Sequence, residues 1–154
     1  MSIDIAEQYD KIYRYCCYRL HRRELAEDIT QETFLRFLGH GGYSGRGEAI
    51  RILYTIARNL CIDEARRRKR EFLTGEEPFF AGETSAPEEE TILARTALFA
   101  AMERLDEEER ELVFLRYVNE VPVQALARLY GISRFALYRR CEQALKKLRR
   151  ELEG

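Results

Sequence analysis

The sequence has no tryptophan, three prolines and two histidines in 154 residues, and its four cysteines form no C-x-x-C pair. The neighbouring Cys16 and Cys17 are poorly placed to share a metal ion. Neither His21 nor His40 has the Cys, Asp or Glu arrangement of a metal site or a catalytic triad. We therefore expect no catalytic residues, no metal and no cofactor, and we interpret the cysteines as reduced core or helix-face residues.

Long hydrophobic runs are also absent. No apolar stretch approaches the length of a membrane span, and the opening MSIDIAEQYD lacks the basic and apolar regions of a signal peptide. We expect a cytoplasmic protein that does not insert into a membrane.

Charge, in contrast, is plentiful and segregated along the chain. Residues 1–74 carry 14 Lys and Arg against 11 Asp and Glu, residues 75–90 none against six, and residues 91–154 carry 12 against 10. The net charge of -1 therefore hides local basic patches, which set the field at a nucleic-acid contact. The same balance argues against a general polyanion binder.

The acidic stretch TGEEPFFAGETSAPEEE, residues 74–90, divides the chain. It holds two of the three prolines and no positive charge, which is typical of a flexible acidic linker. Phe79 and Phe80 are unusual in a linker and are candidates for docking on a neighbouring surface. We predict two compact helical domains, residues 1–73 and 91–154.

The first domain is expected to hold three helices, near residues 3–20, 24–38 and 48–72. The glycine-rich loop GHGGYSGRG, residues 39–47, lacks the Gly-Lys-Ser or Gly-Lys-Thr ending of a phosphate loop and is interpreted as a mobile connection. The residues expected to face inward on the first helix are Tyr9, Ile12, Tyr13, Cys16 and Cys17. The apolar positions of the second are Leu25, Ile29, Phe34, Leu35 and Leu38, and its polar side holds Glu27, Asp28, Gln31, Glu32 and Arg36. The third is expected to bury Ile50, Leu53, Ala57 and Leu60.

Five consecutive cations, residues 66–70, end the third predicted helix. Cations favour the C-terminal end of a helix, but five in a row repel one another unless an anion offsets them. Nucleic-acid phosphate is one such anion, and a solvated basic face is the alternative.

The second domain ends in VPVQALARLYGISRFALYRRCEQALKKLRREL, residues 121–152. Pro122 suits a first helical turn, Gly131 a left-handed helix end, and Ser133 an N-cap. Apolar residues then recur at helical spacing, at Leu137, Cys141, Leu145, Leu148 and Leu152. This pattern predicts a helix-turn-helix whose second helix enters the DNA major groove, with an ordinary charged helical hairpin as the alternative. The DNA-contact candidates are Arg134, Phe135, Tyr138, Arg139 and Arg140.

Three ordered motifs resemble the extracytoplasmic-function (ECF) group of bacterial RNA polymerase sigma factors. They are AEDITQETFLRFL (residues 26–38), LYTIARNLCIDEARRRKR (residues 53–70) and the helix-turn-helix after LDEEERELVFLRYVNEV. The resemblance implies an all-α protein of two small bundles, a region 2-like domain in residues 1–73 and a region 4-like domain in residues 91–154, joined by the flexible acidic linker.

The resemblance also implies roles for particular residues. The surface for core RNA polymerase would comprise Asp28, Gln31, Glu32, Phe34 and Arg36. The residues for the −10 promoter element and the melted strand would be Tyr43, Arg46, Asn59, Asp63, Arg66 and Arg67. In the loop before the third helix, Tyr43 would stack on an extruded base while Arg46 holds the backbone. The helix-turn-helix would bind the −35 element as duplex.

The implied partners are core RNA polymerase, promoter DNA and an anti-sigma factor, with the chain a monomer when free of polymerase. Two other functions stay open from the sequence. One is a helix-turn-helix transcriptional regulator, although no dimerisation or ligand domain is evident. The other is a sigma-like adaptor that occupies polymerase without initiating transcription.

The chain departs from the family pattern at several positions. Ile52 stands where the family often has Trp, Ala49 where it often has Phe, and Glu120 where Gly is frequent. Pro122 replaces a common Ser or Thr cap, and the sequence RFALYRR replaces a start of small residues in the recognition helix. Asp106 and Glu109 still form a plausible capping pair for the helix that follows.

Overall fold

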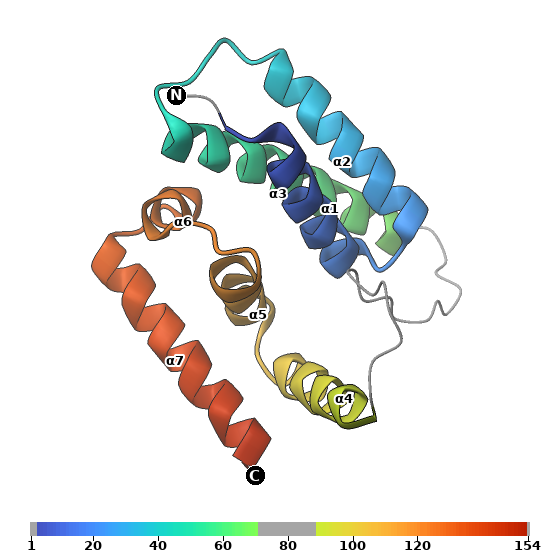
Figure 1. Ribbon diagram of the computed structural model, residues 1–154, viewed down its shortest axis with the longest axis vertical. Helices are drawn as coiled ribbons and strands as arrows, with labels where there is room; N and C mark the ends of the chain where they lie inside the picture. The colour runs from blue at the N-terminus through green and yellow to red at the C-terminus, as the bar shows by residue number, and fades with distance from the viewer. Residues whose placement is uncertain (1–2, 71–88, 154) are drawn as a thin grey trace. The chain divides into compact units, whose positions relative to one another are not determined.

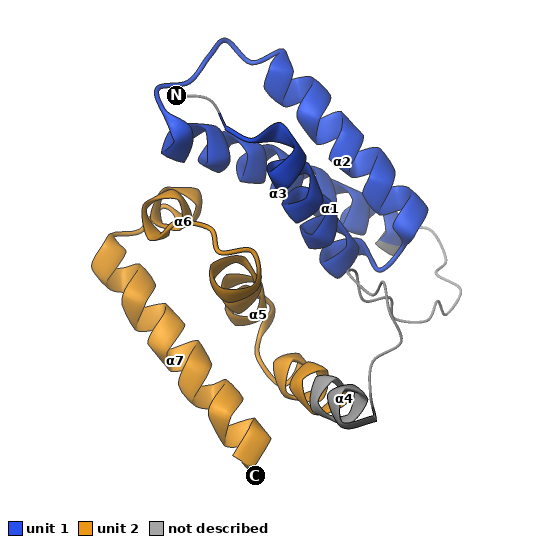
Figure 2. Ribbon diagram, viewed as in Figure 1, with its two compact units in different colours: residues 1–82 blue, residues 83–154 orange. Residues whose placement is uncertain are grey.

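The structure, a computed structural model, describes residues 3–70 and 89–153, with side chains omitted at 69–70 and 89–95. The chain divides into two compact units, residues 1–82 and 83–154 (Figure 2). All regular structure within the described ranges is helical, as predicted. None of the helices in those ranges has the length and apolar character needed to span a bilayer.

Unit 1 contains three helices, α1 (Ile5–Leu20), α2 (Arg23–Leu38) and α3 (Arg46–Arg70), and each packs against the other two (Figure 1). The Asp4 carboxylate caps α1 by accepting a hydrogen bond from the backbone N–H of Glu7 at 3.1 Å. His21, the C-cap residue after α1, has φ of 59° and lies in the left-handed region. These caps set the short turn that brings α2 back along α1.

The core of unit 1 combines aromatic, aliphatic and thiol side chains from all three helices. Tyr15 and Tyr54 are buried with their rings edge to face, 6.0 Å apart between centroids. The Sγ atoms of Cys16 and Cys61 lie 3.9 Å apart, and the hydrogen bond between these thiols lowers the pKa of Cys16. All four cysteines are free and buried, which confirms their interpretation as core residues. The remaining fully buried members include Ile12, Leu20, Leu53 and Ala57.

The buried side of α2 is not the one that its leucines predict. Leu35 and Leu38 are 66% and 71% exposed, whereas Thr30 and Thr33 are completely buried. Each threonine hydroxyl donates to the carbonyl oxygen four residues earlier, at 2.6 Å and 2.7 Å, so its polar group is satisfied inside the core. Leu35 and Leu38, predicted to lie among the apolar positions opposite the polar side, therefore belong to the solvent-facing side instead.

Unit 2 consists of α4 (Glu89–Glu103), α5 (Glu107–Val113), a π-helical segment η1 (Phe114–Val118), α6 (Val123–Tyr130) and α7 (Arg134–Glu153). α4, α5 and α7 share one apolar core, formed by Ala101, Met102, Leu105, Val113, Ala144 and Leu148. α4 begins inside the segment predicted as linker. The rest of that segment, with Phe79 and Phe80, lies outside the described residues.

The turn between α4 and α5 is fixed at both ends by hydrogen bonds. The predicted capping pair is confirmed, because the Asp106 carboxylate accepts from the Glu109 N–H at 2.8 Å while the Glu109 carboxylate accepts from the Asp106 N–H at 3.1 Å. The Arg110 guanidinium donates to the carbonyl oxygens of Met102 and Leu105 at 3.0 Å and 2.9 Å. It thereby bonds to the backbone at the end of α4 and in the turn that follows, and holds that turn against α5.

α7 buries a stripe that differs in part from the predicted one. Leu137, Cys141 and Leu148 are buried as predicted, and burial raises the pKa of the Cys141 thiol. Leu152 is 48% exposed, and the small Ala144 takes a fully buried place that the sequence pattern did not assign. Ala144 packs there in one buried cluster with side chains of α4 and α5.

Pro122 and Glu120 occupy unusual positions before α6. Pro122 is the N-cap residue, with ψ of 143°, rather than the first helical residue predicted from its type. Glu120 has φ of 53°, a left-handed conformation that costs most L-residues about 1–2 kcal/mol and that explains why glycine suits this position.

We expect Glu120→Gly to raise the free energy of unfolding by up to about 1 kcal/mol, because glycine adopts a positive φ without the Cβ penalty. Urea denaturation of the whole chain measures the change. Glu120→Ala is the control, since it removes the carboxylate but keeps the Cβ. An equal gain in the alanine variant would show that charge, not backbone strain, is responsible.

Candidate functional site

The solvent-facing side of α2 carries the polar residues predicted to contact a partner. Asp28 and Gln31 are exposed one turn apart, and the Arg36 Nε donates to the Glu32 carboxylate at 2.8 Å. An exposed pair of this kind contributes only a few tenths of a kcal/mol to helix stability. This side of α2 therefore exposes two carboxylates, one amide and one paired guanidinium. These groups contribute little to the stability of the helix.

Phe34 does not share that exposure. It is 6% exposed, and its ring lies 5.2 Å from the Tyr9 ring and 6.5 Å from the Phe37 ring, centroid to centroid. Phe34 therefore anchors α2 to α1 beneath the polar side, and it is placed to support a contact surface rather than to form it.

The sequence interpretation missed two members of this exposed side. Leu35 lies seven residues, about two turns, after Asp28, and Leu38 lies one turn further on, so both continue the same side of the helix. We call Asp28, Gln31, Glu32, Leu35 and Leu38 the α2 face. Residues spaced three, four and seven positions after Asp28 lie on its side of the helix, so the sequence could have given most of this set if Asp28 had been taken as the centre of the exposed side. Its mixture of acidic and exposed apolar groups is typical of a protein-binding surface.

The loop between α2 and α3 positions Tyr43. Its ring stacks on Phe37 with centroids 5.5 Å apart and an interplanar angle of 26°, and Tyr43 remains 38% exposed. Gly42 and Gly45 flank this part of the loop with φ of 113° and 95°, values that side-chain-bearing residues rarely adopt. The aromatic ring is thus supported on one side while part of it stays open to solvent.

The start of α3 ties down the same loop. The Glu48 carboxylate accepts hydrogen bonds from the Ser44 hydroxyl at 2.6 Å and from the Ser44 N–H at 3.3 Å. Arg46 is exposed at the first residue of the helix. Ala49 and Ile52 are both buried, so their side chains belong to the core of unit 1.

Further along α3, three predicted residues lie on one exposed side. Asn59, Asp63 and Arg66 follow one another at steps of four and three residues, and all are exposed. Arg67 is also exposed, with its guanidinium 2.8 Å from the Glu64 carboxylate. Arg46 is separated from Asn59 by 13 residues of helix, about 20 Å, so the structure does not bring the loop residues and this side together.

The basic run at the end of α3 is only partly available for an anion. The Arg68 guanidinium donates to the carbonyl oxygen of Leu20 at 2.8 Å, at the end of α1. It satisfies a helix-terminal carbonyl and links α3 to α1. Arg66 and Arg67 remain at the surface, while the side chains at 69 and 70 lie outside the described residues.

In unit 2, α6 and α7 form the predicted helix-turn-helix. Gly131 ends α6 with φ of 68°, and the Ser133 hydroxyl caps α7 by accepting from the Ala136 N–H at 3.1 Å. The buried Glu111 of α5 accepts a hydrogen bond from the Tyr130 hydroxyl at 2.6 Å. This contact fixes the end of α6 against α5, and it thereby positions the turn between α6 and α7.

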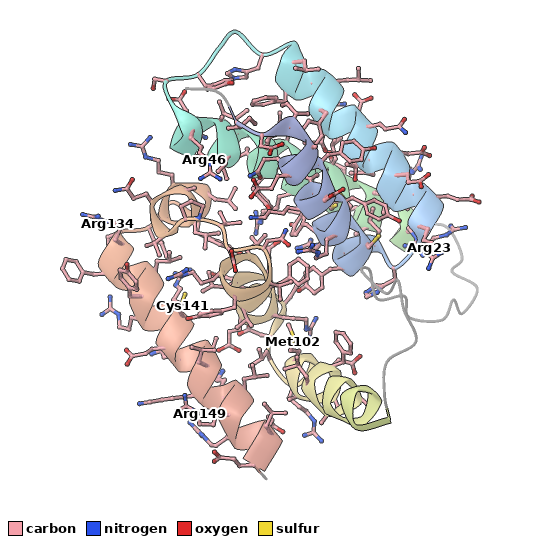
Figure 3. The ribbon with its side chains drawn as sticks, viewed as in Figure 1. Arg23, Arg46, Met102, Arg134, Cys141 and Arg149 are labelled. Carbon is pink, nitrogen blue, oxygen red and sulfur yellow. The ribbon has the colours of Figure 1, made fainter. Side chains whose placement is uncertain are left out.

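The five residues predicted to contact duplex DNA are all exposed on the first two turns of α7: Arg134, Phe135, Tyr138, Arg139 and Arg140. Figure 3 shows Arg134 at the start of α7, with Cys141 on the side that faces the other helices of the unit.

Two acidic residues of α5 hold basic residues of α7 in place. The Arg140 guanidinium pairs with the Glu108 carboxylate. The Lys147 ammonium lies 2.8 Å from Glu109, whose hydrogen bond raises the pKa of that lysine. The role of Glu108 and Glu109 was not predicted, because cross-helix pairs have no signature in local spacing. These pairs orient the side chains of Arg140 and Lys147. Arg134 and Arg139 are exposed on the first two turns of the same helix.

The two units match two known family models, which define a sigma-type transcription protein. Residues 5–71 match Sigma-70 region 2, and residues 101–150 match Sigma-70, region 4. The second match contains the helix-turn-helix except the last three residues of α7, and the first contains the α2 face.

Similar proteins narrow this class. The chain is 37% identical over 155 residues to the ECF RNA polymerase sigma factor BldN of Streptomyces coelicolor. That alignment covers 95% of this chain but only 58% of BldN. It is 30% identical to the ECF RNA polymerase sigma factor SigL of Mycobacterium tuberculosis, covering 92% of this chain and 82% of that protein. The chain belongs to the ECF group of RNA polymerase sigma factors.

A solved structure supports the fold. The sigma factor RpoE from Bartonella quintana, in complex with the anti-sigma factor NepR, superposes with a TM-score of 0.66 over 94% of this chain and 91% of that chain. The sequence identity is 17%, so the likeness concerns the fold alone.

Proposed function

We propose that this chain is an alternative sigma factor that binds core RNA polymerase through the α2 face and directs it to a small set of promoters. The main support for this proposal is that one chain presents two surfaces. The α2 face of unit 1 is acidic and apolar, and the exposed side of α7 in unit 2 is basic. A transcription regulator built on a helix-turn-helix alone has no need of the first surface. Membership of the ECF group supports this proposal.

The −10 contact is assigned to unit 1. Asn59 and Asp63 offer amide and carboxylate groups for base edges, and the neighbouring Arg66 and Arg67 offer guanidinium groups for phosphates or bases. Tyr43, supported from behind by Phe37, would stack on a base extruded from the duplex, with Arg46 near the backbone. Promoter melting then follows from binding, because the open strand gains stacking contacts that duplex DNA does not offer.

The −35 contact is assigned to unit 2, where α7 enters the major groove and its flanking cations reach phosphates. In this proposal residues 1–73 and 91–154 act as separate DNA-binding domains, and residues 74–90 tether them. A tether raises the effective concentration of the second site once the first is bound, so two modest contacts yield one selective complex.

The remaining features of the proposal follow from the family. The chain would act in the cytoplasm, carry no catalytic residues of its own, and be a monomer when free of polymerase. An anti-sigma factor that covers its domains is the expected inhibitor.

In vitro transcription with core polymerase and a genomic promoter pool tests this function. We expect specific transcripts that require the chain. Retained polymerase binding without any chain-dependent transcript would contradict the proposal and favour the adaptor function. Duplex binding without polymerase binding would instead favour a helix-turn-helix regulator.

A further inference from the structure

The start of α7 exposes two aromatic rings. Phe135 is 85% exposed, the highest value among the large hydrophobic residues in the described part of the chain, and Tyr138 is 53% exposed. A single exposed apolar side chain needs no explanation. Here, however, two rings lie one turn apart on the helix that the structure presents to solvent in a helix-turn-helix.

The rings lie on the side of α7 that points away from the core. Leu137, Cys141 and Ala144 define the buried side of the same helix. At 3.6 residues per turn, Phe135 projects roughly opposite to that stripe, with Tyr138 flanking it. Neither ring is needed for the packing of unit 2, so a structural role does not account for them.

Cations surround the aromatic pair. Arg134 and Arg139 are exposed beside Phe135, and Arg140 is held by Glu108 at the flank. In a helix inserted into the major groove, such flanking cations reach phosphates while residues on the central line reach base edges. Charge complementarity therefore favours a polyanion as the occupant, with the rings directed at its bases.

A phenyl ring cannot read hydrogen-bond donors or acceptors, since it has neither. The only apolar group that an unmodified base pair displays in the major groove is the C5-methyl of thymine. We propose that Phe135, with Tyr138 beside it, makes this sigma factor select thymine in its −35 element through contact with that methyl group. This inference rests on the proposed function and adds to it the chemistry by which a base is chosen.

The test uses the whole chain bound to core polymerase. Duplexes are first selected from a random −35 library, and each thymine in the winning sequence is then replaced by deoxyuridine, which removes only the methyl group. Burying one methyl-sized group against a ring corresponds to about fourfold in affinity. For the wild-type chain, we expect replacement of thymine by deoxyuridine to lower the affinity about fourfold at one or two positions. For the Phe135→Ala variant, the same replacements should leave the affinity unchanged. Leu152→Ala, an exposed apolar truncation far along the same helix, should behave as wild type.

The outcomes separate this inference from the proposed function. If a sequence is selected but no uracil substitution weakens binding, methyl readout is overturned while the sigma function stands. If no sequence is selected, the −35 assignment itself fails and this inference with it. If Phe135→Ala weakens polymerase association and leaves the thymine preference intact, the aromatic pair serves a protein contact instead.

Discussion

Asp28→Arg is expected to lower the affinity of this chain for core RNA polymerase by at least about tenfold. On the α2 face the Glu32 carboxylate is paired with Arg36, whereas Asp28 presents its carboxylate to solvent, so the group that it meets on the partner is expected to be cationic. A reversed charge at Asp28 would place like charges together, at a cost of about 1.4 kcal/mol or more. Asp28 is exposed, and it takes part in none of the capping or core contacts of unit 1, so the fold should be unaffected. Titration of the labelled chain with core polymerase, followed by fluorescence anisotropy, measures the change.

The matched control is Asp10→Arg, the same charge reversal at an exposed position of α1. It changes the net charge equally but lies outside the α2 face, so its affinity should stay within about twofold of wild type. Equal losses in both variants would show that net charge governs the association, and the assignment of the α2 face would then be wrong. A companion variant, Leu35→Ala, should also weaken binding if the exposed apolar part of the face is used.

Leu137→Ala is expected to lower the free energy of unfolding of unit 2 by about 2–5 kcal/mol. Leu137 is completely buried on α7, and its truncation leaves a cavity beneath the recognition helix. Since α7 carries all five proposed −35 contacts, duplex binding should fall together with stability. Amide hydrogen exchange on the whole chain locates the loss, which should appear in α5, α6 and α7.

Leu152→Ala tests whether burial is the cause. It is the same substitution on the same helix, but Leu152 is 48% exposed, and we expect a change below about 0.5 kcal/mol. Comparable destabilisation by both variants would mean that helix propensity in α7, and not core packing, dominates the stability of the unit.

Local signals made much of unit 2 predictable. Capping by Asp106 and Ser133 and the left-handed end at Gly131 depend on residues within one turn of each other, so the sequence displays them directly. The exposure of the five proposed DNA contacts followed from the apolar stripe opposite them. Family membership followed from the order of three motifs, each of which is weak in isolation.

The inner face of α2 could not be predicted in the same way. Threonine is usually polar surface, and its burial at positions 30 and 33 depends on hydroxyl bonds to helix carbonyls that form only once the helix exists. With those two inside, Leu35 and Leu38 are left outside. Phe34, in contrast, is buried, in agreement with its place among the predicted apolar positions of the helix.

Long-range contacts were also invisible in the sequence. The basic run of α3 was interpreted as a phosphate contact or a solvated basic face, yet Arg68 reaches a carbonyl 48 residues earlier in the chain. The pairing of Glu108 with Arg140 spans 32 residues and likewise depends on how the helices pack. Glu120 is a different case: the sequence showed only that it stands where glycine is frequent in the family, and its positive φ gives the physical reason for that frequency.

Permanganate footprinting of promoter DNA tests the central claim most directly, because the reagent oxidises thymines that have lost their stacking neighbours. On a promoter identified by transcription, thymines near the start site should become reactive only when core polymerase and this chain are both present. Tyr43→Ala should reduce that reactivity while polymerase binding is retained. Promoter thymines that stay protected in a polymerase complex already saturated with the wild-type chain would contradict the account.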